Sequence, residues 1–541
     1  MRISLPSNNK PWFNKWPPDV PKTISYPVLS LQGILQETAK NYPADIAIVY
    51  GVEEITYEKL DLLSNQFAHA LIKLGVKKGD RVAIFLPNVP QFIIAFFGIL
   101  KSGAVVTAIS PLHREREVEY QLCDSEAETI VVLDSLFAIV DNVWAKTKLK
   151  NVLIVSLNEI TNFPSKTKVR TFLELFQEAQ ETPIQLQNDP REDLAVLQYT
   201  GGTTGKAKGA MLTHTNLVSN ALAFAVWIKG RPYQETFLTA LPLFHIYGMT
   251  TSMTVPISLA AKIVLMPKFE PAKALKIIQT YGVTVFCGVP TMYSALLASS
   301  ELEKYDLTSI SVCISGASAL APQIQKQFMK VTGGLLAEGY GLTEASPVTH
   351  CNPVDRTMKT VKVGSIGLPL PNTDAKIVDL VTGKKLTPGE TGELAVKGLQ
   401  VMKGYWHKPE ETALVLRDGW LLTGDIAHMD EDGYFYITDR KKDLIKYKDY
   451  SVYPRELEDI LYENPAVKLC VVVGKPDTTA GEIPKAFVIL KEGTYTSAIE
   501  LMTFVNNKVA LYKSIRELEF RKELPISSAG KVLKRILQEN Q

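Results

Sequence analysis

The sequence predicts an α/β protein built on doubly wound parallel sheets, and three observations lead to this fold class. The chain has 541 residues, too many for one hydrophobic core, so we expect two to four packed units. Strand-like and helix-like stretches alternate through residues 27–190 and again after residue 261, as in parallel sheets covered by helices. Hydrophobic residues make up 46% of the chain and charged residues 21%, which excludes disorder as its main state.

The individual elements follow from hydrophobic spacing. SLQGILQETAKNY has the period of an amphipathic helix, whereas RVAIFL at 81–86 and TIVVLD at 129–134 are compact apolar runs typical of buried strands. The pattern returns in three later stretches, each followed by a helix-like segment: KIVLM at 262–266, VTVFCGVP at 283–290 and VCISG at 312–316. We therefore expect a second α/β unit in the middle of the chain.

The pattern of expected strands and helices changes twice in the last third of the chain. From about 360 to 438, short strands broken by Gly and Pro predict a small antiparallel β unit. The charged segment DRKKD at 439–443 is the expected interdomain hinge. Residues 444–541 contain strands and helices of their own, enough for a compact α+β domain, so the expected N-terminal domain covers 1–438.

Charge and cysteine content exclude several classes of partner. The 59 basic and 57 acidic residues leave a net charge of +2, which gives no whole-chain attraction to nucleic acid. Five scattered cysteines without a CxxC pair predict neither a zinc site nor a disulfide framework, and they favour a reducing, cytoplasmic compartment. The longest apolar run, FIIAFFGIL at 92–100, is half the length that crosses a bilayer, so we expect no transmembrane segment. Peripheral membrane contact and a homodimer stay open.

The stretch YTGGTTGKAKG at 199–209 predicts a polyphosphate-binding loop. It stands between a strand-like run, LAVLQ, and a helix-like run that begins near residue 215, with Thr213 and Thr215 as caps. Glycines let backbone N–H groups turn inward toward an anion, and Lys206 and Lys208 add positive charge. Thr200 and Ala207 stand where the usual P-loop signature requires a glycine and a Ser or Thr, so a different nucleotide fold is expected.

This loop resembles the phosphate loop of the adenylate-forming superfamily, which contains acyl-CoA synthetases, luciferases and nonribosomal adenylation domains. Five further stretches fall in that family's order, and the resemblance spans about residues 27–535. It implies a large N-terminal domain of two doubly wound α/β subdomains and a small β-barrel-like subdomain, followed by a small mobile α+β domain. It also implies Mg²⁺, ATP and CoA as the cofactor and co-substrates.

The resemblance assigns residues to the nucleotide and the metal. In EGYGLTEAS at 338–346, Tyr340 would pack on adenine, Thr343 would bind the α-phosphate and Glu344 would hold Mg²⁺. A hard cation that bridges phosphates needs few protein carboxylates, so one Glu suffices. The residues assigned to ATP or AMP are Thr200, Gly201, Gly202, Thr203, Thr204, Gly205, Lys206, Gly339, Tyr340, Gly341, Thr343, Asp425, Ile437, Arg440 and Lys531.

It also assigns residues to catalysis and the acid. Lys531, Thr204 and Glu344 would be catalytic, because a mobile ammonium can neutralise charge that builds on the α-phosphate. Lys442 would be the hinge about which the C-terminal domain turns between two half-reactions. The expected acyl pocket is lined by Trp227, His245, Tyr247, Val289, Met292, Gly316 and Ala317.

The expected CoA tunnel contains Lys448, Asp449 and Tyr450. Relatives usually have a glycine where Asp449 stands, and a carboxylate there could narrow the tunnel or repel the thiol. The resemblance implies ATP-dependent conversion of a carboxylic acid to acyl-AMP and then acyl-CoA, and WFNKWPPDVP near the N-terminus favours a medium- or long-chain fatty acid. Short-chain, hydroxy or aryl acids, and an acceptor other than CoA, stay open as alternatives.

Overall fold

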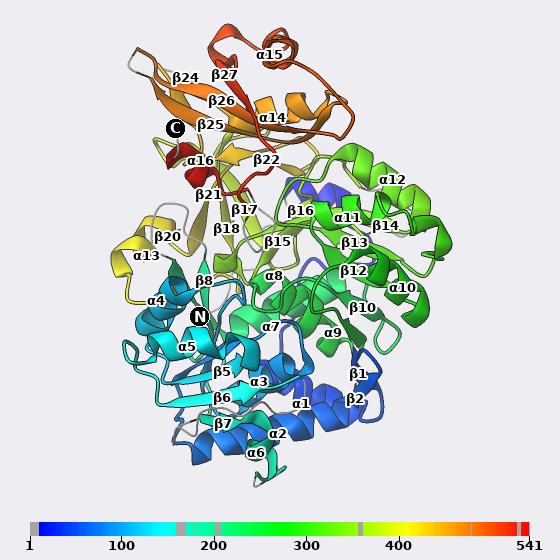
Figure 1. Cartoon of the computed structure of the whole chain (residues 1–541), viewed down its shortest axis with the longest axis vertical. Helices are drawn as coiled ribbons and strands as arrows, with labels where there is room; N and C mark the ends of the chain where they lie inside the picture. The colour runs from blue at the N-terminus through cyan, green and yellow to red at the C-terminus, as the bar shows by residue number, and fades with distance from the viewer. Residues whose placement is uncertain are drawn as a thin grey trace. The chain divides into compact units, whose positions relative to one another are not determined.

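The computed structural model describes residues 10–157, 169–177, 179–200, 207–354, 361–448, 450–477, 479–526 and 532–539. The chain divides into two compact units. Unit 1 contains residues up to Asp374 together with Lys397–Leu421. Unit 2 contains Ala375–Val396 and the chain from Leu422 onward. Figure 1 labels most of the elements of both units.

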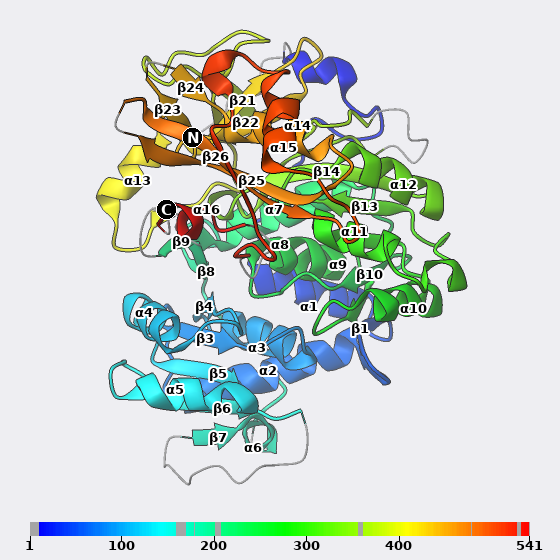
Figure 2. The ribbon, with the colours of Figure 1, turned by 45° about the horizontal axis from the view of Figure 1, so that its top comes forward.

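The first sheet of unit 1 has the order β19-β9-β8-β4-β3-β5-β6-β7 among the described residues, and Figure 2 shows several of these strands side by side. From β8 to β7 the neighbours run parallel, and β9 and β19 add an antiparallel edge. The strands are β3 (Arg81–Phe85), β4 (Val105–Ala108), β5 (Thr129–Leu133), β6 (Asn151–Val155), β7 (Val169–Thr171), β8 (Leu194–Thr200), β9 (Lys208–Thr213) and β19 (Gly404–Tyr405).

The second sheet of unit 1 has the order β16-β15-β14-β13-β12-β10-β11-β1-β2 in the part of the chain that the structure describes. It is parallel from β14 to β1 and antiparallel at both edges. The strands are β1 (Ile46–Tyr50), β2 (Glu53–Thr56), β10 (Thr236–Thr239), β11 (Lys262–Leu265), β12 (Val285–Gly288), β13 (Val312–Ser315), β14 (Leu335–Gly341), β15 (Val348–Cys351) and β16 (Leu368–Pro369).

Helices cover these sheets through alternating buried side chains. On the first sheet, Ala83 and Phe85 belong to one core cluster with Val118 and Leu122 of α4, because every second residue of a strand faces the same side. The helices of unit 1 are α1 (Leu31–Asn41), α2 (Tyr57–Lys73), α3 (Pro90–Lys101), α4 (Glu115–Ser125), α5 (Phe137–Trp144), α6 (Phe172–Gln177), α7 (His214–Trp227), α8 (Ile246–Met249), α9 (Val255–Ser258), α10 (Pro271–Tyr281), α11 (Pro290–Leu297), α12 (Pro322–Thr332) and α13 (Pro409–Val415).

The strands expected at 81–86, 129–134, 262–266, 283–290 and 312–316 all form, and the predicted α/β fold class is confirmed. One feature differs from a simple division by sequence order. Strands β1 and β2, which come from the first part of the chain, join the second sheet by pairing β1 with β11. None of the described helices combines the length and the apolar character that crossing a membrane requires.

The small β unit expected at 360–438 forms a sheet of order β17-β18-β21-β20, with β22 paired antiparallel to β21. Its strands are β17 (Asp374–Val378), β18 (Gly392–Lys397), β20 (Leu416–Arg417), β21 (Trp420–Met429) and β22 (Phe435–Arg440). The division into compact units places most of β17, β18, β21 and β22 with the C-terminal residues. The expected domain boundary at residue 438 and the hinge at 439–443 stay predictions.

The C-terminal part of unit 2 is an α+β structure, as expected. Its sheet has the order β24-β23-β26-β25 with β27 beside β26, and β25 and β26 form a long antiparallel hairpin. Val472, Val488 and Leu501 are among the buried residues of its core. The elements are β23 (Ile445–Tyr447), β24 (Tyr450–Val452), β25 (Val467–Asp477), β26 (Gly481–Leu490), β27 (Glu517–Phe520), α14 (Pro454–Tyr462), α15 (Ala498–Asn506) and α16 (Lys534–Glu539).

Candidate active site

The predicted phosphate loop connects two strands of a β-hairpin. β8 and β9 pair antiparallel, and Thr200 lies opposite Lys208. The expected order of strand, loop and helix was wrong, because β9 stands between the loop and α7. The sequence KGAMLT does not indicate this strand, since Gly209 and Ala210 are poor strand formers. Strand β9 therefore separates the loop from the N-terminus of α7 along the chain.

Both flanks of this loop are bonded to helix α4. The hydroxyl of Tyr199, at the end of β8, donates to Asp124 Oδ2 over 2.6 Å. In the opposite direction, the hydroxyl of Tyr120 donates to the carbonyl of Ala207 over 2.7 Å. The two flanks are thereby held by side chains one helical turn apart. Sequence reasoning did not find Tyr120 or Asp124, because nothing in a helix sequence indicates which distant loop it supports.

The helix that follows β9 begins where the capping pattern predicted. The Thr213 side chain accepts a hydrogen bond of 3.2 Å from the backbone N–H of Asn216, and the Asn216 side chain accepts from the Thr213 backbone N–H over 2.8 Å. This reciprocal capping satisfies two backbone donors at the start of α7. The Asn216 amide also donates to the carbonyls of Leu399 and Val401. The capping residue Asn216 therefore also holds the segment that contains Leu399 and Val401 against the start of α7.

The predicted adenine segment lies at the C-terminal end of strand β14 in the second sheet. Tyr340 is on β14 opposite His350 of β15, and their ring centroids are 6.0 Å apart in an edge-to-face arrangement. A Cβ at Gly341 would lie 2.2 Å from the carbonyl oxygen of Pro347, so only glycine fits at this close backbone approach. Gly339 is on the same strand, and a short 3₁₀ turn, Thr343–Ala345, follows it. The structure therefore brings Gly339, Tyr340, Gly341, Thr343 and Glu344 together at one strand end.

Glu344 is held by two hydrogen bonds. Its Oε1 accepts from the Tyr405 hydroxyl over 2.7 Å, and its backbone carbonyl accepts from the Met402 N–H over 2.8 Å. Within the described ranges, no group of three or more His, Cys, Asp or Glu side chains could hold a metal. The residues present fit a Mg²⁺ ion that takes one protein carboxylate and otherwise binds phosphate oxygens and water.

In unit 2, the predicted ribose residues face each other on the β21–β22 hairpin. Asp425 and Arg440 are cross-strand partners, and Arg440 Nε lies 3.3 Å from Asp425 Oδ1. The Asp425 side chain is only 8% exposed, whereas Arg440 is 42% exposed. Ile437 is on the same hairpin, opposite Ala427. A nearly buried carboxylate of this kind offers two acceptor oxygens to a diol.

The predicted hinge and tunnel residues lie near the next hairpin of unit 2. Lys442 is in the turn after β22, and its side chain is exposed. Lys448 follows β23 with φ of +52°, and its N–H donates to the carbonyl of Ala480. Tyr450 begins β24 and stacks on Tyr512 with ring centroids 4.5 Å apart. Predicted site residues outside the described part of the chain are Gly201, Gly202, Thr203, Thr204, Gly205, Lys206, Asp449 and Lys531.

Several predicted acyl-pocket residues cluster at the ends of β12 and β13. The Tyr247 hydroxyl donates to the carbonyl of Ile314 over 2.9 Å, and a Cβ at Gly316 would lie 3.0 Å from the Tyr247 ring. His245 is the N-cap of α8, and its Nδ1 accepts from the Tyr247 N–H over 3.2 Å. Val289 is the N-cap of α11, directly after β12. These contacts hold the Tyr247 ring in place beside Gly316.

The other predicted pocket residues have different surroundings. Trp227 is fully buried, packs edge-on against Trp16 at 4.9 Å and donates from its indole N–H to the carbonyl of Asn352. Met292 packs against the core cluster around α10, α11 and α12. Ala317 follows Gly316 with φ of +70°, a left-handed conformation that is uncommon for alanine. Their roles in acid binding stay predictions.

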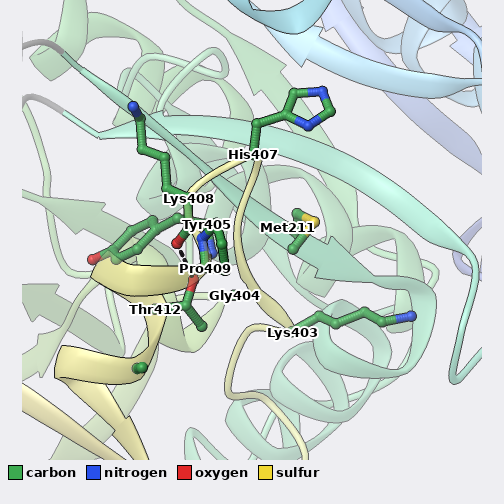
Figure 3. Close-up of a pocket in the computed structure, with 9 residues that line it drawn as sticks. Met211, Lys403, Gly404, Tyr405, His407, Lys408, Pro409 and Thr412 are labelled. Atoms are coloured by element: carbon green, nitrogen blue, oxygen red, sulfur yellow. Dashed lines mark hydrogen bonds between the residues drawn. The ribbon is translucent and has the colours of Figure 1, made fainter.

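An open pocket of about 430 Å³ lies beside the hairpin strand β9 (Figure 3). It is separate from the predicted acyl residues, none of which lines it. Its lining residues are Met211, Lys403, Gly404, Tyr405, His407, Lys408, Pro409, Thr412 and Ala413.

Comparison with known proteins supports this set of motifs. A model of the AMP-binding enzyme family matches residues 35–406, and a model of the AMP-binding enzyme C-terminal domain matches residues 456–531. A long-chain-fatty-acid–CoA ligase of Bacillus subtilis is 43% identical over 99% of this chain and 98% of its own, and one of Salmonella typhimurium is 38% identical over 98% of each. Among solved structures, an anthranilate CoA ligase in complex with anthranoyl-AMP superposes with a TM-score of 0.86 and 27% identity, covering 95% of this chain and 98% of its own.

Proposed function

Because this chain belongs to the AMP-binding enzyme family over most of its length, we propose that it activates a long-chain fatty acid with ATP and transfers the acyl group to CoA. The observation that carries the proposal is the 43% identity, over 99% of the chain, to a protein named long-chain-fatty-acid–CoA ligase. The solved relative that holds an acyl-adenylate supports the same intermediate.

The proposed reaction has two steps. In the first, a carboxylate oxygen of the acid attacks the α-phosphorus of ATP, the bond to pyrophosphate breaks, and acyl-AMP forms. In the second, the CoA thiol loses its proton and attacks the acyl carbonyl, and AMP leaves with the electrons of the broken carbon–oxygen bond. Neither step needs a protein nucleophile, so the task of the chain is to position the reactants and to balance charge.

The residues of unit 1 divide this task between them. The β8–β9 hairpin presents the loop that would cradle the phosphates, held at Tyr199 and Ala207 by helix α4. Glu344 would bind Mg²⁺, which neutralises phosphate charge when it is bound. Tyr247 and Gly316 would border the aliphatic chain of the acid, because their buried and largely apolar surroundings disfavour charged groups on that chain.

The residues of unit 2 would act on the nucleotide and on the second step. Asp425 would accept hydrogen bonds from the ribose hydroxyls, and Arg440 forms an ion pair with this carboxylate at 3.3 Å. Lys531 would meet the α-phosphate during adenylation, and rotation about Lys442 would then bring Lys448, Asp449 and Tyr450 to the thiol. We place the enzyme in the cytoplasm, because its five cysteines are all free and four of them are buried.

The test separates the two steps. Purified protein is incubated with Mg·ATP and acids from acetate to stearate, with benzoate added to the panel, in the presence and absence of CoA. Pyrophosphate, AMP and acyl-CoA are quantified separately. We expect pyrophosphate and acyl-CoA to rise together for the long aliphatic acids. Acyl-AMP that accumulates regardless of CoA would instead indicate another acceptor, and preference for benzoate would overturn the fatty-acid assignment.

A pair of lysine variants gives the control. Lys531→Ala should abolish acyl-AMP formation, because it removes the ammonium proposed to meet the α-phosphate. Lys508→Ala removes an exposed lysine of unit 2 that pairs with Glu463 and lies over the ring of Phe504, and it should leave both steps unchanged. Equal activity of the two variants would contradict the role of Lys531.

A further inference from the structure

We propose that Tyr405 is a positioning residue that fixes the Glu344 carboxylate in the orientation that binds the divalent cation of Mg·ATP. This inference rests on the proposed function, because that function supplies the cation. It adds a residue that the motif analysis did not assign.

The first observation is the contact itself. Tyr405 is 7% exposed, and its hydroxyl donates to Glu344 Oε1 over 2.7 Å. A donor on one carboxylate oxygen fixes the plane of the group and leaves the other oxygen to bind a cation.

The second observation is the rigidity of the frame that carries Tyr405. Gly404 and Tyr405 pair with Met211 and Ala210 as the edge strand β19 against β9. The Tyr405 N–H also donates to Thr412 Oγ1 over 2.9 Å, a bond visible in Figure 3. The side chain is therefore anchored at its backbone and at its hydroxyl.

The third observation connects this frame to the phosphate loop. The N–H of Trp406 donates to the carbonyl of Gly209 over 2.8 Å, two residues after the point where Ala207 is held by α4. Tyr405 thus joins the strand that leaves the loop to the carboxylate expected to share the metal with the loop's phosphates. The short segment from Gly404 to Trp406 therefore contacts both Glu344 and strand β9, and it holds these two elements relative to each other.

The positive charge that lies over the Tyr405 ring is paired with a carboxylate. Lys208 Nζ lies 5.0 Å from the centroid of the Tyr405 ring and forms an ion pair with Glu411. A cation over the ring is attracted to the ring face, which stabilises the position of the ring. The role proposed for Tyr405 therefore depends on its hydroxyl, while Lys208 and the ring keep that hydroxyl in place.

The experiment measures metal binding directly. Mn²⁺ is titrated into the full-length protein with saturating ATP and followed by electron paramagnetic resonance, for wild type, Tyr405→Phe, Glu344→Gln and the double variant. Tyr405→Phe keeps the ring and loses only the hydroxyl. We expect the Mn²⁺ dissociation constant to rise about tenfold in Tyr405→Phe, as for other residues that orient metal ligands. Because Tyr405 acts through Glu344, Tyr405→Phe should hardly change the Mn²⁺ dissociation constant further in the Glu344→Gln background.

A matched control is Tyr281→Phe, which removes a tyrosine hydroxyl that donates to the carbonyl of Gly51 in unit 1. It should leave Mn²⁺ binding unchanged. An unaltered dissociation constant in Tyr405→Phe, or fully additive effects in the double variant, would overturn the inference while leaving the proposed function intact. If wild type binds ATP without any dependence on Mn²⁺, the metal assignment of Glu344 fails together with the inference.

Discussion

The hydroxyl of Tyr199 donates a 2.6 Å hydrogen bond to the carboxylate of Asp124, which ties the end of strand β8 to helix α4. The same helix holds the other flank of the predicted phosphate loop, because Tyr120 donates to the carbonyl of Ala207. A glycine-rich loop has high conformational entropy, so anchored flanks reduce the cost of ordering it around phosphates.

Removal of the Tyr199 hydroxyl should therefore weaken ATP binding. A hydrogen bond to a carboxylate contributes about 1.5–3 kcal/mol. We expect Tyr199→Phe to raise the KM for ATP by about tenfold and to leave the KM for the acid nearly unchanged, measured by pyrophosphate exchange. Tyr281→Phe serves again as the comparison. A change confined to the KM for the acid would show that the flank does not position the nucleotide.

Asp425 is the second residue whose change should affect the nucleotide. An ionised carboxylate forms hydrogen bonds roughly twice as strong as those of a neutral acceptor, and Asp425 also pairs with Arg440 at 3.3 Å. Asp425→Asn should raise the KM for ATP by about tenfold or more. Isothermal titration with a nonhydrolysable ATP analogue provides the measurement, and unaltered affinity would rule out the ribose role.

Gly316 should control the space available to the acid. A Cβ at this position would lie 3.0 Å from Tyr247 Cζ, and Tyr247 cannot easily retreat because its hydroxyl is bonded to the carbonyl of Ile314. Gly316→Ala should cost about 1–3 kcal/mol of stability by overpacking. We also expect kcat/KM for palmitate to fall more than that for octanoate. Equal loss for both acids would place Gly316 outside the acyl pocket.

Asp439 should make stability depend on pH in a defined direction. Burial raises the pKa of this carboxyl from 3.8 to about 6, against the opposing charge of Lys534 and the backbone N–H groups of Arg455 and Arg440. A raised native pKa means that folding favours the protonated form. Its stabilisation is complete below about pH 3.8 and is lost as the pH rises through about 6.

The test of Asp439 compares one variant with wild type at two pH values. Asp439→Asn cannot ionise, so its stability relative to wild type should improve by about 1–3 kcal/mol between pH 4.5 and pH 7.5. Thermal unfolding of the full chain at both pH values measures this difference. Constant relative stability would show that Asp439 titrates normally in the folded protein.

Much of the fold could be predicted from local pattern. The runs at 81–86 and 262–266 form strands because they are short, apolar and bounded by turn residues, and SLQGILQETAKNY forms a helix because its apolar residues fall on one face. Strand β9 was missed, since its small residues carry little strand propensity. β9 forms a strand because it pairs with β8 and with β19. Of these two partners, β19 is distant in the sequence.

The sequence by itself determined the α/β class, the order of the motifs and the residue types of the candidate site, because these depend on spacing along the chain. Tertiary structure decided which segments share a sheet, as when β1 joins β11 across more than two hundred residues. It also decided which side chains support the site, as when Tyr405 reaches Glu344. Such contacts are set by packing between distant segments, and the local periodicity of a single sequence carries no record of them.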